Sequence, residues 1–266
     1  MRARRGIYPA LAVIFFLGVI GCGRSRALSE EGLQRLEQGK QTSALELFDR
    51  ALRSNAQEPL ALYGKGMLLS EEQITEDIAL TMLKQAVQQG DLKEKYRIRA
   101  LVRIAEIAVK RKDKDETLQN LSKISGAMRV IDGATLRRMA QIYLQLKEKD
   151  RAREVVTAYL ETHAGDEETE YFLLRLYALE LKDGKSAAKL CGKVDWQKSR
   201  HPRYLLNCSR VTAAVNDYTT ALTLIDLYLK RQAGGAAAPG PDKAINELRE
   251  SIVRKRGKFD PVEADF

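Results

Sequence analysis

Few residues in this chain have the types and spacing that catalysis requires. The two histidines, His163 and His201, lie far apart and outside any metal-ligand spacing. The tetrapeptide DGKS at 183–186 resembles the end of a phosphate-binding loop, but Leu179 occupies the position that requires glycine, and a helical pattern precedes it. We interpret DGKS as a turn between two helices. Since the many carboxylates lie near Lys or Arg, as in solvated ion pairs, the sequence predicts no catalytic residue, no metal site and no cofactor.

The N-terminus has the composition of an export signal. Residues 1–6 are basic, and residues 7–20 form an apolar run of 14 residues that ends at Gly21 and Cys22. A membrane-spanning helix needs about 20 apolar residues. The run is therefore too short to span a bilayer comfortably, and it favours a secretory signal.

The sequence VIGC at 19–22 is similar to the lipobox of bacterial lipoproteins, in which the cysteine becomes the lipidated first residue. This resemblance implies a signal peptide at 1–21, lipidation at Cys22 and a short tether at 22–27. Several acyl chains would hold the protein firmly at a membrane. Gly23 after the cysteine is typical of lipoproteins sent to the outer membrane. The alternative is a plain signal peptide with an incidental cysteine.

Composition favours one long helical domain. Charged residues make up 30% of the chain and apolar residues 44%, with six prolines in 266 residues. The formal net charge of +9 permits contact with anionic lipid, peptidoglycan or an acidic partner. Because an exported protein is not expected to meet nucleic acid, we predict no nucleic-acid partner.

A pattern of small and large residues recurs along the chain every 34 to 38 positions. The small residues are Ala44, Ala79, Thr117, Ala152, Ala187 and Ala221. Sixteen positions before them lie Leu28, Tyr63, Leu101, Leu136, Tyr171 and Leu205. In the fourth copy, apolar residues at helical spacing stand on both sides of the polar turn KEKD, which predicts two amphipathic helices that share a face.

This pattern resembles the tetratricopeptide-repeat family, whose helix-turn-helix repeat is about 34 residues long. The resemblance implies an all-α fold: an α-solenoid of about six helical hairpins over residues 28–231, wound as a right-handed superhelix. Leu28-Ser29-Glu30-Glu31 has the pattern of a helix N-cap, so we expect the first helix to begin there. Met67 and Arg175 replace a small residue at a close-contact position. The second and fifth repeats should therefore pack less regularly.

The resemblance also places Cys191 on the second helix of repeat five and Cys208 on the first helix of repeat six, where the two helices abut. In an oxidising compartment the two could form a disulfide. Free buried cysteines in the core are the alternative, and the sequence leaves both possibilities open.

After the repeats, residues 232–241 have the composition of a flexible linker, and residues 242–266 predict a basic C-terminal helix with a loose tail. Ile245, Leu248 and Ile252 form a short apolar stripe on this helix. Repeat arrays need a terminal cap, so we expect the helix to fold back on repeat six. The alternative is a helix that docks on a surface.

In the tetratricopeptide family the first helices line a concave groove. By resemblance, the predicted groove residues are Arg99, Val102, Arg137, Gln141, Phe172, Leu176, Arg203, Leu206 and Arg210. Apolar side chains among arginines suit an extended or helical peptide with acidic groups, because guanidinium groups bind carboxylates bidentately. The alternative is that these arginines are ordinary residues on a solvated helix surface.

Together these features resemble the scaffold lipoproteins of the bacterial outer membrane, such as pilotin-like, barrel-assembly and murein-hydrolase adaptor lipoproteins. The resemblance implies a non-catalytic scaffold that faces the periplasm, is held at the membrane by its N-terminal lipid and binds an envelope protein in its groove. The alternative function is binding of cell wall or anionic lipid through the basic C-terminal helix.

Overall fold

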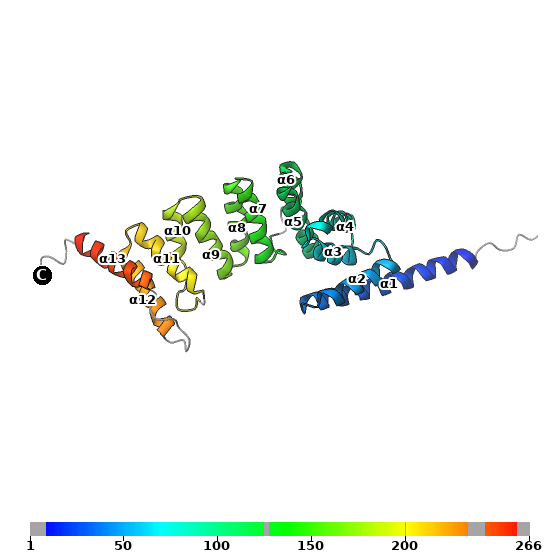
Figure 1. Cartoon of the computed structure of the whole chain (residues 1–266), viewed down its shortest axis with the longest axis horizontal. Coiled ribbons are helices and arrows are strands. Elements are labelled where there is room, and N and C mark those ends of the chain that lie inside the picture. The colour runs from blue at the N-terminus through cyan, green and yellow to red at the C-terminus, as the bar shows by residue number, and fades with distance from the viewer. Residues whose placement is uncertain (1–8, 125–127, 200, 234–242, 260–266) are drawn as a thin grey trace, which may run out of the picture. The chain divides into compact units, whose positions relative to one another are not determined.

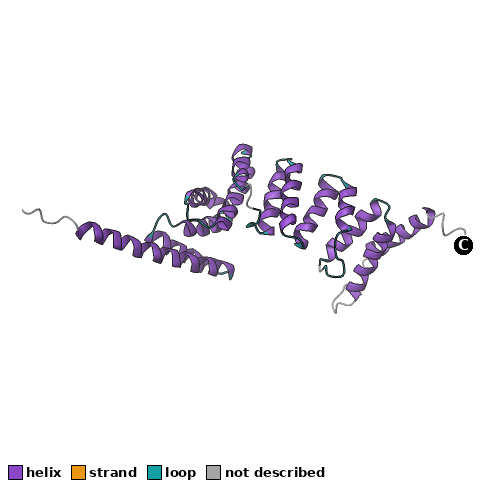
Figure 2. Cartoon of the chain, turned by 180° about the vertical axis from the view of Figure 1, so that it is seen from behind, coloured by secondary structure: helices purple, strands orange, loops and turns teal. Residues whose placement is uncertain are grey.

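Every regular element in the described part of the chain is a helix. The computed structural model describes residues 9–124, 128–199, 201–233 and 243–259. Within them the helices are joined by short loops and no strand forms (Figure 2). The chain divides into unit 1, Met1–Leu146, and unit 2, Lys147–Phe266. Figure 1 labels the α-helices of both units. The predicted all-α class, built from paired helices, is confirmed.

Unit 1 is a series of helical hairpins. Its helices are α1 (Pro9–Glu37), α2 (Gln41–Ser54), α3 (Pro59–Leu69), the 3₁₀ helix η1 (Gln73–Thr75), α4 (Glu76–Gln88), α5 (Glu94–Lys110), α6 (Lys114–Ser122) and α7 (Gly133–Gln145). The first helix of a hairpin packs on its partner and on the first helix of the next hairpin, as α3 does on α4 and α5. Close packing explains why the recurring small residues Ala44, Ala79 and Thr117 are fully buried.

A residue with left-handed backbone conformation closes most hairpins, five positions before the small residue. Gly39, Lys112, Lys147, Lys182 and Asn216 all have positive φ, between 54° and 74°. In the second hairpin this position is Ile74, which lies in η1 and is 94% exposed. The second hairpin therefore departs from the common turn. The looser packing expected from Met67 concerns the helix crossing and stays a prediction.

The start of the first hairpin differs from the prediction. α1 runs without a break from Pro9 to Glu37, so the helix does not begin at Leu28, and residues 22–27, expected as a tether, are helical. The Ser29 hydroxyl donates to the Ser25 carbonyl oxygen one turn earlier, at 2.8 Å. The N-cap prediction is wrong because a serine that binds its i−4 carbonyl fits inside a helix.

Two glycines make room for a large, fully buried aromatic ring in the first hairpins. Phe48 of α2 is fully buried, and its ring lies against Gly32 of α1 and Gly64 of α3. A Cβ built on Gly64 would lie 2.2 Å from Phe48 Cζ, and one on Gly32 would lie 2.6 Å from Phe48 Cε1. The three helices can approach this closely only because these two positions lack a side chain.

Unit 2 continues the helical pairs. Its helices are α8 (Lys149–Thr162), α9 (Glu167–Arg175), the π-helix η2 (Leu176–Glu180), α10 (Gly184–Cys191), α11 (Pro202–Ala214), α12 (Tyr218–Ala233) and α13 (Lys243–Phe259). Successive helices contact one another from α8 to α13. The small residues Ala152, Ala187 and Ala221 are fully buried, as the repeat pattern requires.

A disulfide joins the fifth and sixth hairpins. Cys191 of α10 and Cys208 of α11 are bonded, with their Cα atoms 5.6 Å apart. Both are fully buried and belong to a cluster with Leu174, Tyr204 and Leu205. Of the two possibilities that the sequence left open, the structure has the bridge.

The C-terminal helix covers the last hairpin. Ile245 and Ile252 of α13 are buried against Ala221 and Ile225 of α12, with Leu248 half-buried beside them. Arg249 Nε lies 2.8 Å from Asp226 Oδ1 of α12. The apolar stripe of α13 is therefore used within the protein, which is the packing that a terminal cap provides.

The first helix of the fifth hairpin begins one residue earlier than the repeat pattern predicts. Asp166 caps α9 by accepting the Thr169 N–H at 3.1 Å, in the same way that Asp132 caps α7 by accepting the Thr135 N–H at 2.9 Å. These two caps are 34 residues apart, whereas the small residues of the same two repeats are 35 apart.

The π-helix η2 accommodates the extra residue. In this turn the Leu181 N–H donates to the Leu176 carbonyl at 3.0 Å, and the wider turn restores the register before α10. As a result Leu174 takes the buried close-contact position that the sequence assigned to Arg175, and Arg175 is exposed. The fifth repeat is irregular, as predicted, but the reason is the π-helix: Arg175 does not occupy the helix crossing and is exposed to solvent.

Candidate functional site

Arg99 of α5 is a predicted groove residue whose contacts are well defined. Its Nε and Nη2 each lie 3.0 Å from Asp132 Oδ2, and its guanidinium also interacts with the Tyr63 hydroxyl. Burial of the Tyr63 phenol raises the pKa of that group. Partial burial opposes ionisation of Asp132, but hydrogen bonds from Thr135 and the Arg99 charge lower the pKa of its carboxyl. Arg99 is therefore held in a fixed position.

Arg103 links α3 and α5. Its Nε donates to Ser70 Oγ at 2.8 Å, and it also donates to the Ser70 carbonyl, which ends α3. Its Nη1 donates to Glu106 Oε2 at 2.8 Å. Because its donors are used by the end of α3 and by Glu106, Arg103 has a structural role.

In unit 2, polar side chains form a line across α9 and α11. Asn207 Nδ2 donates to Tyr171 Oη at 2.8 Å, and Arg210 Nη1 lies 3.5 Å from Asn207 Oδ1. The ring of His201, which caps α11, lies 4.4 Å from the Tyr171 ring. Arg175 of α9 is exposed. Cationic and amide groups on two neighbouring first helices can bind carboxylate groups.

Comparison of the sequence with protein-family models and with curated proteins finds no match. Among solved structures, that of PilF from Pseudomonas aeruginosa is similar to this chain. The TM-score is 0.59 at 16% sequence identity, and the alignment covers 86% of this chain and 98% of that chain. The structure of YrrB, described as a TPR protein with an unusual peptide-binding site, is also similar. Its TM-score is 0.50 at 17% sequence identity, and the alignment covers 77% of this chain and 97% of that chain. The chain has the tetratricopeptide-repeat (TPR) fold. At such identities the likeness shows the fold alone.

The TPR fold allows the predicted groove residues of unit 1 to be compared with the structure. Gln141 is exposed, and Arg99 and Arg137 are half-buried. Val102 is 2% exposed, so its assignment to the groove is wrong. It is buried because α5 contacts four other helices, α3, α4, α6 and α7. A helix with so many neighbours buries more of its surface than a helix that packs on only two sides.

In unit 2 the TPR register shift changes the predicted residues of the fifth repeat. Leu176 is 2% exposed, so its assignment to the groove is wrong, because the early start of α9 turns it inward. Phe172 is half-buried. By the register of α7, Tyr171 and Arg175 take the positions assigned to Phe172 and Leu176. The equivalence of the Asp132 and Asp166 caps, each with Thr three residues on, could have revealed this from the sequence.

The predicted residues of the sixth TPR are only partly available. Arg203 and Arg210 are exposed. Leu206 instead packs against the cluster formed by α12 and α13, so its side chain is used in attaching the C-terminal helix. The two arginines are therefore exposed, and their place in a groove stays a prediction, whereas Leu206 is used within the protein.

The residues considered for catalysis have structural roles. His163 stacks on Tyr159 with ring centroids 4.2 Å apart. Asp183 of DGKS caps α10 by accepting the Ser186 N–H at 3.0 Å. The turn therefore ends at Asp183, and Gly184, Lys185 and Ser186 form the first turn of α10. Within the described residues, no three His, Cys, Asp or Glu side chains are arranged to hold a metal ion.

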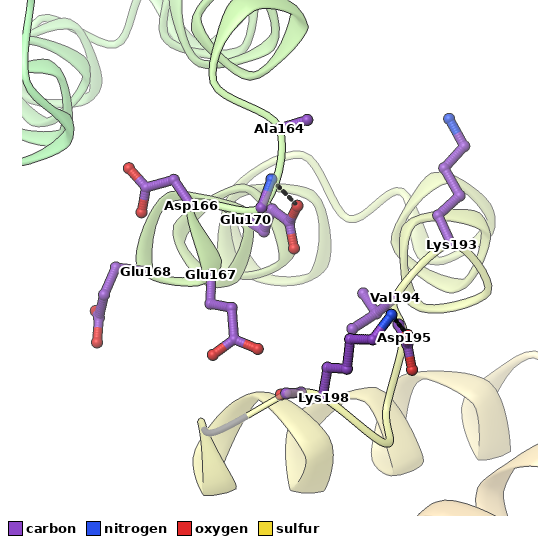
Figure 3. Close-up of a pocket in the computed structure, with 11 residues that line it drawn as sticks. Ala164, Asp166, Glu167, Glu168, Glu170, Lys193, Val194, Asp195 and Lys198 are labelled. Atoms are coloured by element: carbon purple, nitrogen blue, oxygen red, sulfur yellow. Dashed lines mark hydrogen bonds and ion pairs between the residues drawn. The ribbon is translucent and has the colours of Figure 1, made fainter.

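The sequence analysis missed an acidic pocket in unit 2. It has a volume of about 750 Å³ and lies between two segments (Figure 3). One is the loop before α9 together with the first turn of α9, within 164–170, and the other is the loop between α10 and α11, within 193–199. Asp166 is used in capping α9, and Glu168 Oε1 lies 3.4 Å from His201 Nε2. Burial raises the pKa of Glu170, and Glu167 and Asp166 add to the effect. These segments are 23 or more residues apart in the sequence, so no local motif predicts the pocket.

The N-terminal predictions lie largely beyond what the structure tests. The Cys22 side chain falls outside the described residues, as do residues 1–8, so lipidation remains a prediction. Most of the expected linker and the last seven residues are outside it as well. Among the helices that the structure describes, none is both long enough and apolar enough to cross a bilayer.

Proposed function

We propose that the chain is a non-catalytic scaffold lipoprotein of the bacterial envelope. Lipid on Cys22 anchors it to a membrane, and its TPR hairpins face the periplasm and bind a protein partner.

 The observation that carries this proposal is the TPR fold with exposed arginines on neighbouring first helices. Stacked helical hairpins form an extended concave surface, and such surfaces bind other chains. We propose that this membrane is the outer membrane, because Gly23 follows the cysteine, as is typical of lipoproteins sent there.

Two further features support an exported protein. The apolar run at 7–20 and the VIGC sequence suit processing and lipidation at Cys22. The buried disulfide between Cys191 and Cys208 suits an oxidising compartment, because such bonds are rare where thiols are kept reduced. Intact mass measurement of the protein from membranes would test acylation of Cys22.

The partner that fits best is a peptide segment with acidic groups. In unit 2, Tyr171 and Asn207 form a hydrogen-bonded pair. The exposed Arg175 lies one turn after Tyr171 on α9, and the exposed Arg210 lies one turn after Asn207 on α11. This arrangement offers fork-shaped donors for carboxylates beside an aromatic ring.

The test is the double variant Arg175→Glu/Arg210→Glu, used as bait in envelope extract with quantitative mass spectrometry. We expect the yield of the main captured partner to fall at least fivefold, because two donors become like charges. The matched control is Arg151→Glu/Arg254→Glu, which makes the same charge change at two other exposed arginines. Equal capture by the first variant and the wild-type chain would remove this face as the binding site.

The alternative function, binding of cell wall or anionic lipid through α13, has less support. Its apolar residues Ile245 and Ile252 are buried against α12, so they are not available to enter a membrane surface.

A further inference from the structure

A basic pocket lies at the end of the α1–α2 hairpin that is nearest to Cys22. It encloses about 360 Å³ and is lined by Arg24 and Leu28 of α1 and by Arg50, Arg53 and Ser54 of α2. No described residue that lines it is acidic. Three exposed arginines from two helices therefore line one small, open pocket.

These three arginines differ from their neighbours in having no carboxylate partner. On α1, which carries Arg24, the neighbouring Arg26 pairs with Glu30 and Arg35 pairs with Glu31. Arg24, Arg50 and Arg53 form no ion pair within the part of the chain that the structure describes. Residues 1–22 contain no Asp or Glu, so the preceding segment has no carboxylate side chain to offer.

The backbone that carries the pocket is fixed by buried polar contacts. Ser25 Oγ donates to Glu58 Oε2 at 3.3 Å, and Arg26 Nη1 lies 3.7 Å from Glu58 Oε1. These contacts tie α1 to the start of α3 directly beside Arg24. Because the like charges of the pocket repel one another on a backbone that is held in place, an anion that enters it would relieve the repulsion.

We infer that this pocket binds the phosphate of an anionic phospholipid headgroup. The inference rests on the proposed lipidation of Cys22, which lies two positions before Arg24, about 3 Å along a helix axis. Acyl chains at Cys22 would bring the pocket to the headgroup layer. Guanidinium forks bind phosphate bidentately, and the half-buried Leu28 offers an apolar wall for the glycerol ester region.

The test uses the protein purified from membranes in detergent, with its acylation read by intact mass. The probes are dihexanoyl phosphatidylglycerol, dihexanoyl phosphatidylcholine and inorganic phosphate, with binding followed by calorimetry. We expect the anionic lipid to bind at least tenfold more tightly than either of the others. Arg50→Gln/Arg53→Gln should weaken its binding about 25-fold, since each basic residue near an anionic lipid contributes about fivefold.

The matched control is Lys40→Gln/Lys123→Gln, which removes two charges from exposed positions outside the pocket and should change the affinity less than twofold. Equal weakening by both double variants would overturn the proposal, because binding would then follow net charge. Equal binding of inorganic phosphate and the anionic lipid would overturn the assignment to a lipid. An unmodified Cys22 in the mass measurement would instead contradict the proposed anchor, which separates the two failures.

Discussion

The disulfide between α10 and α11 gives the sharpest quantitative prediction. Cys191 and Cys208 are 17 positions apart, and closing a loop of this length lowers the entropy of the unfolded chain. In the chain-entropy model this stabilises the folded state by about 3 kcal/mol. Reduction should therefore lower the free energy of unfolding of unit 2 by about that amount, without removing any side chain from the core.

The single tryptophan provides the assay. Trp196 lies in the loop between the two bridged helices, and its ring is 5.2 Å from the ring of Tyr204, which belongs to the same cluster as both cysteines. Urea unfolding followed by tryptophan fluorescence, with and without dithiothreitol, reports on this region. We expect the reduced protein to unfold at lower urea concentration.

A double variant separates the cross-link from the packing. Cys191→Ala/Cys208→Ala loses the bridge and leaves space in the core, so it should be less stable than the reduced wild-type chain. Dithiothreitol should have no effect on it. If reduction changes the stability of the wild-type chain by less than about 0.5 kcal/mol, the loop-closure reasoning is refuted. Free thiols at both positions in protein taken from cells would also remove the support for an oxidising compartment.

Two other perturbations follow from the structure. Gly64→Ala should lower the free energy of unfolding in urea by about 1–3 kcal/mol, although alanine has the better helix propensity, because the new Cβ meets the buried Phe48 ring. In a Phe48→Leu background the same glycine substitution should be less destabilising, because the ring is gone. Asp132→Ala should cost about 1 kcal/mol at neutral pH through loss of the α7 cap. Since the folded-state pKa of Asp132 lies below 3.8, its contribution is present above that pH and is lost as the pH falls through the lowered pKa. The difference between variant and wild type, measured from pH 7 to pH 2.5, should therefore shrink at the acid end; a constant difference would contradict the assignment.

The sequence determined the helical hairpins and their count, because a small residue at each crossing is a local requirement of close helix packing. Ala152, Ala187 and Ala221 recur at near-constant spacing, and each is fully buried. The turn five residues earlier recurs with them, with positive φ at Lys147, Lys182 and Asn216. Spacing alone carries this information, since each turn and crossing involves residues close together in the chain.

The groove positions were less predictable, because exposure depends on how many helices surround a residue. Val102 fits the groove spacing but is buried by the neighbours of α5. Leu176 fits it only if the fifth hairpin has the same length as the fourth, and the π-helix η2 breaks that assumption by one residue. A one-residue change in a helix turns a side chain by about 100°, enough to exchange exposed and buried positions.

Only the tertiary structure decided which distant side chains meet. Arg24 and Arg53 share a pocket because α2 folds back along α1. Glu167 and Lys193 share another because the start of α9 lies beside the loop that follows α10. Sequence periodicity reports which side of a helix is buried. It does not report which groups from separate segments converge, because that depends on the packing of whole helices against one another.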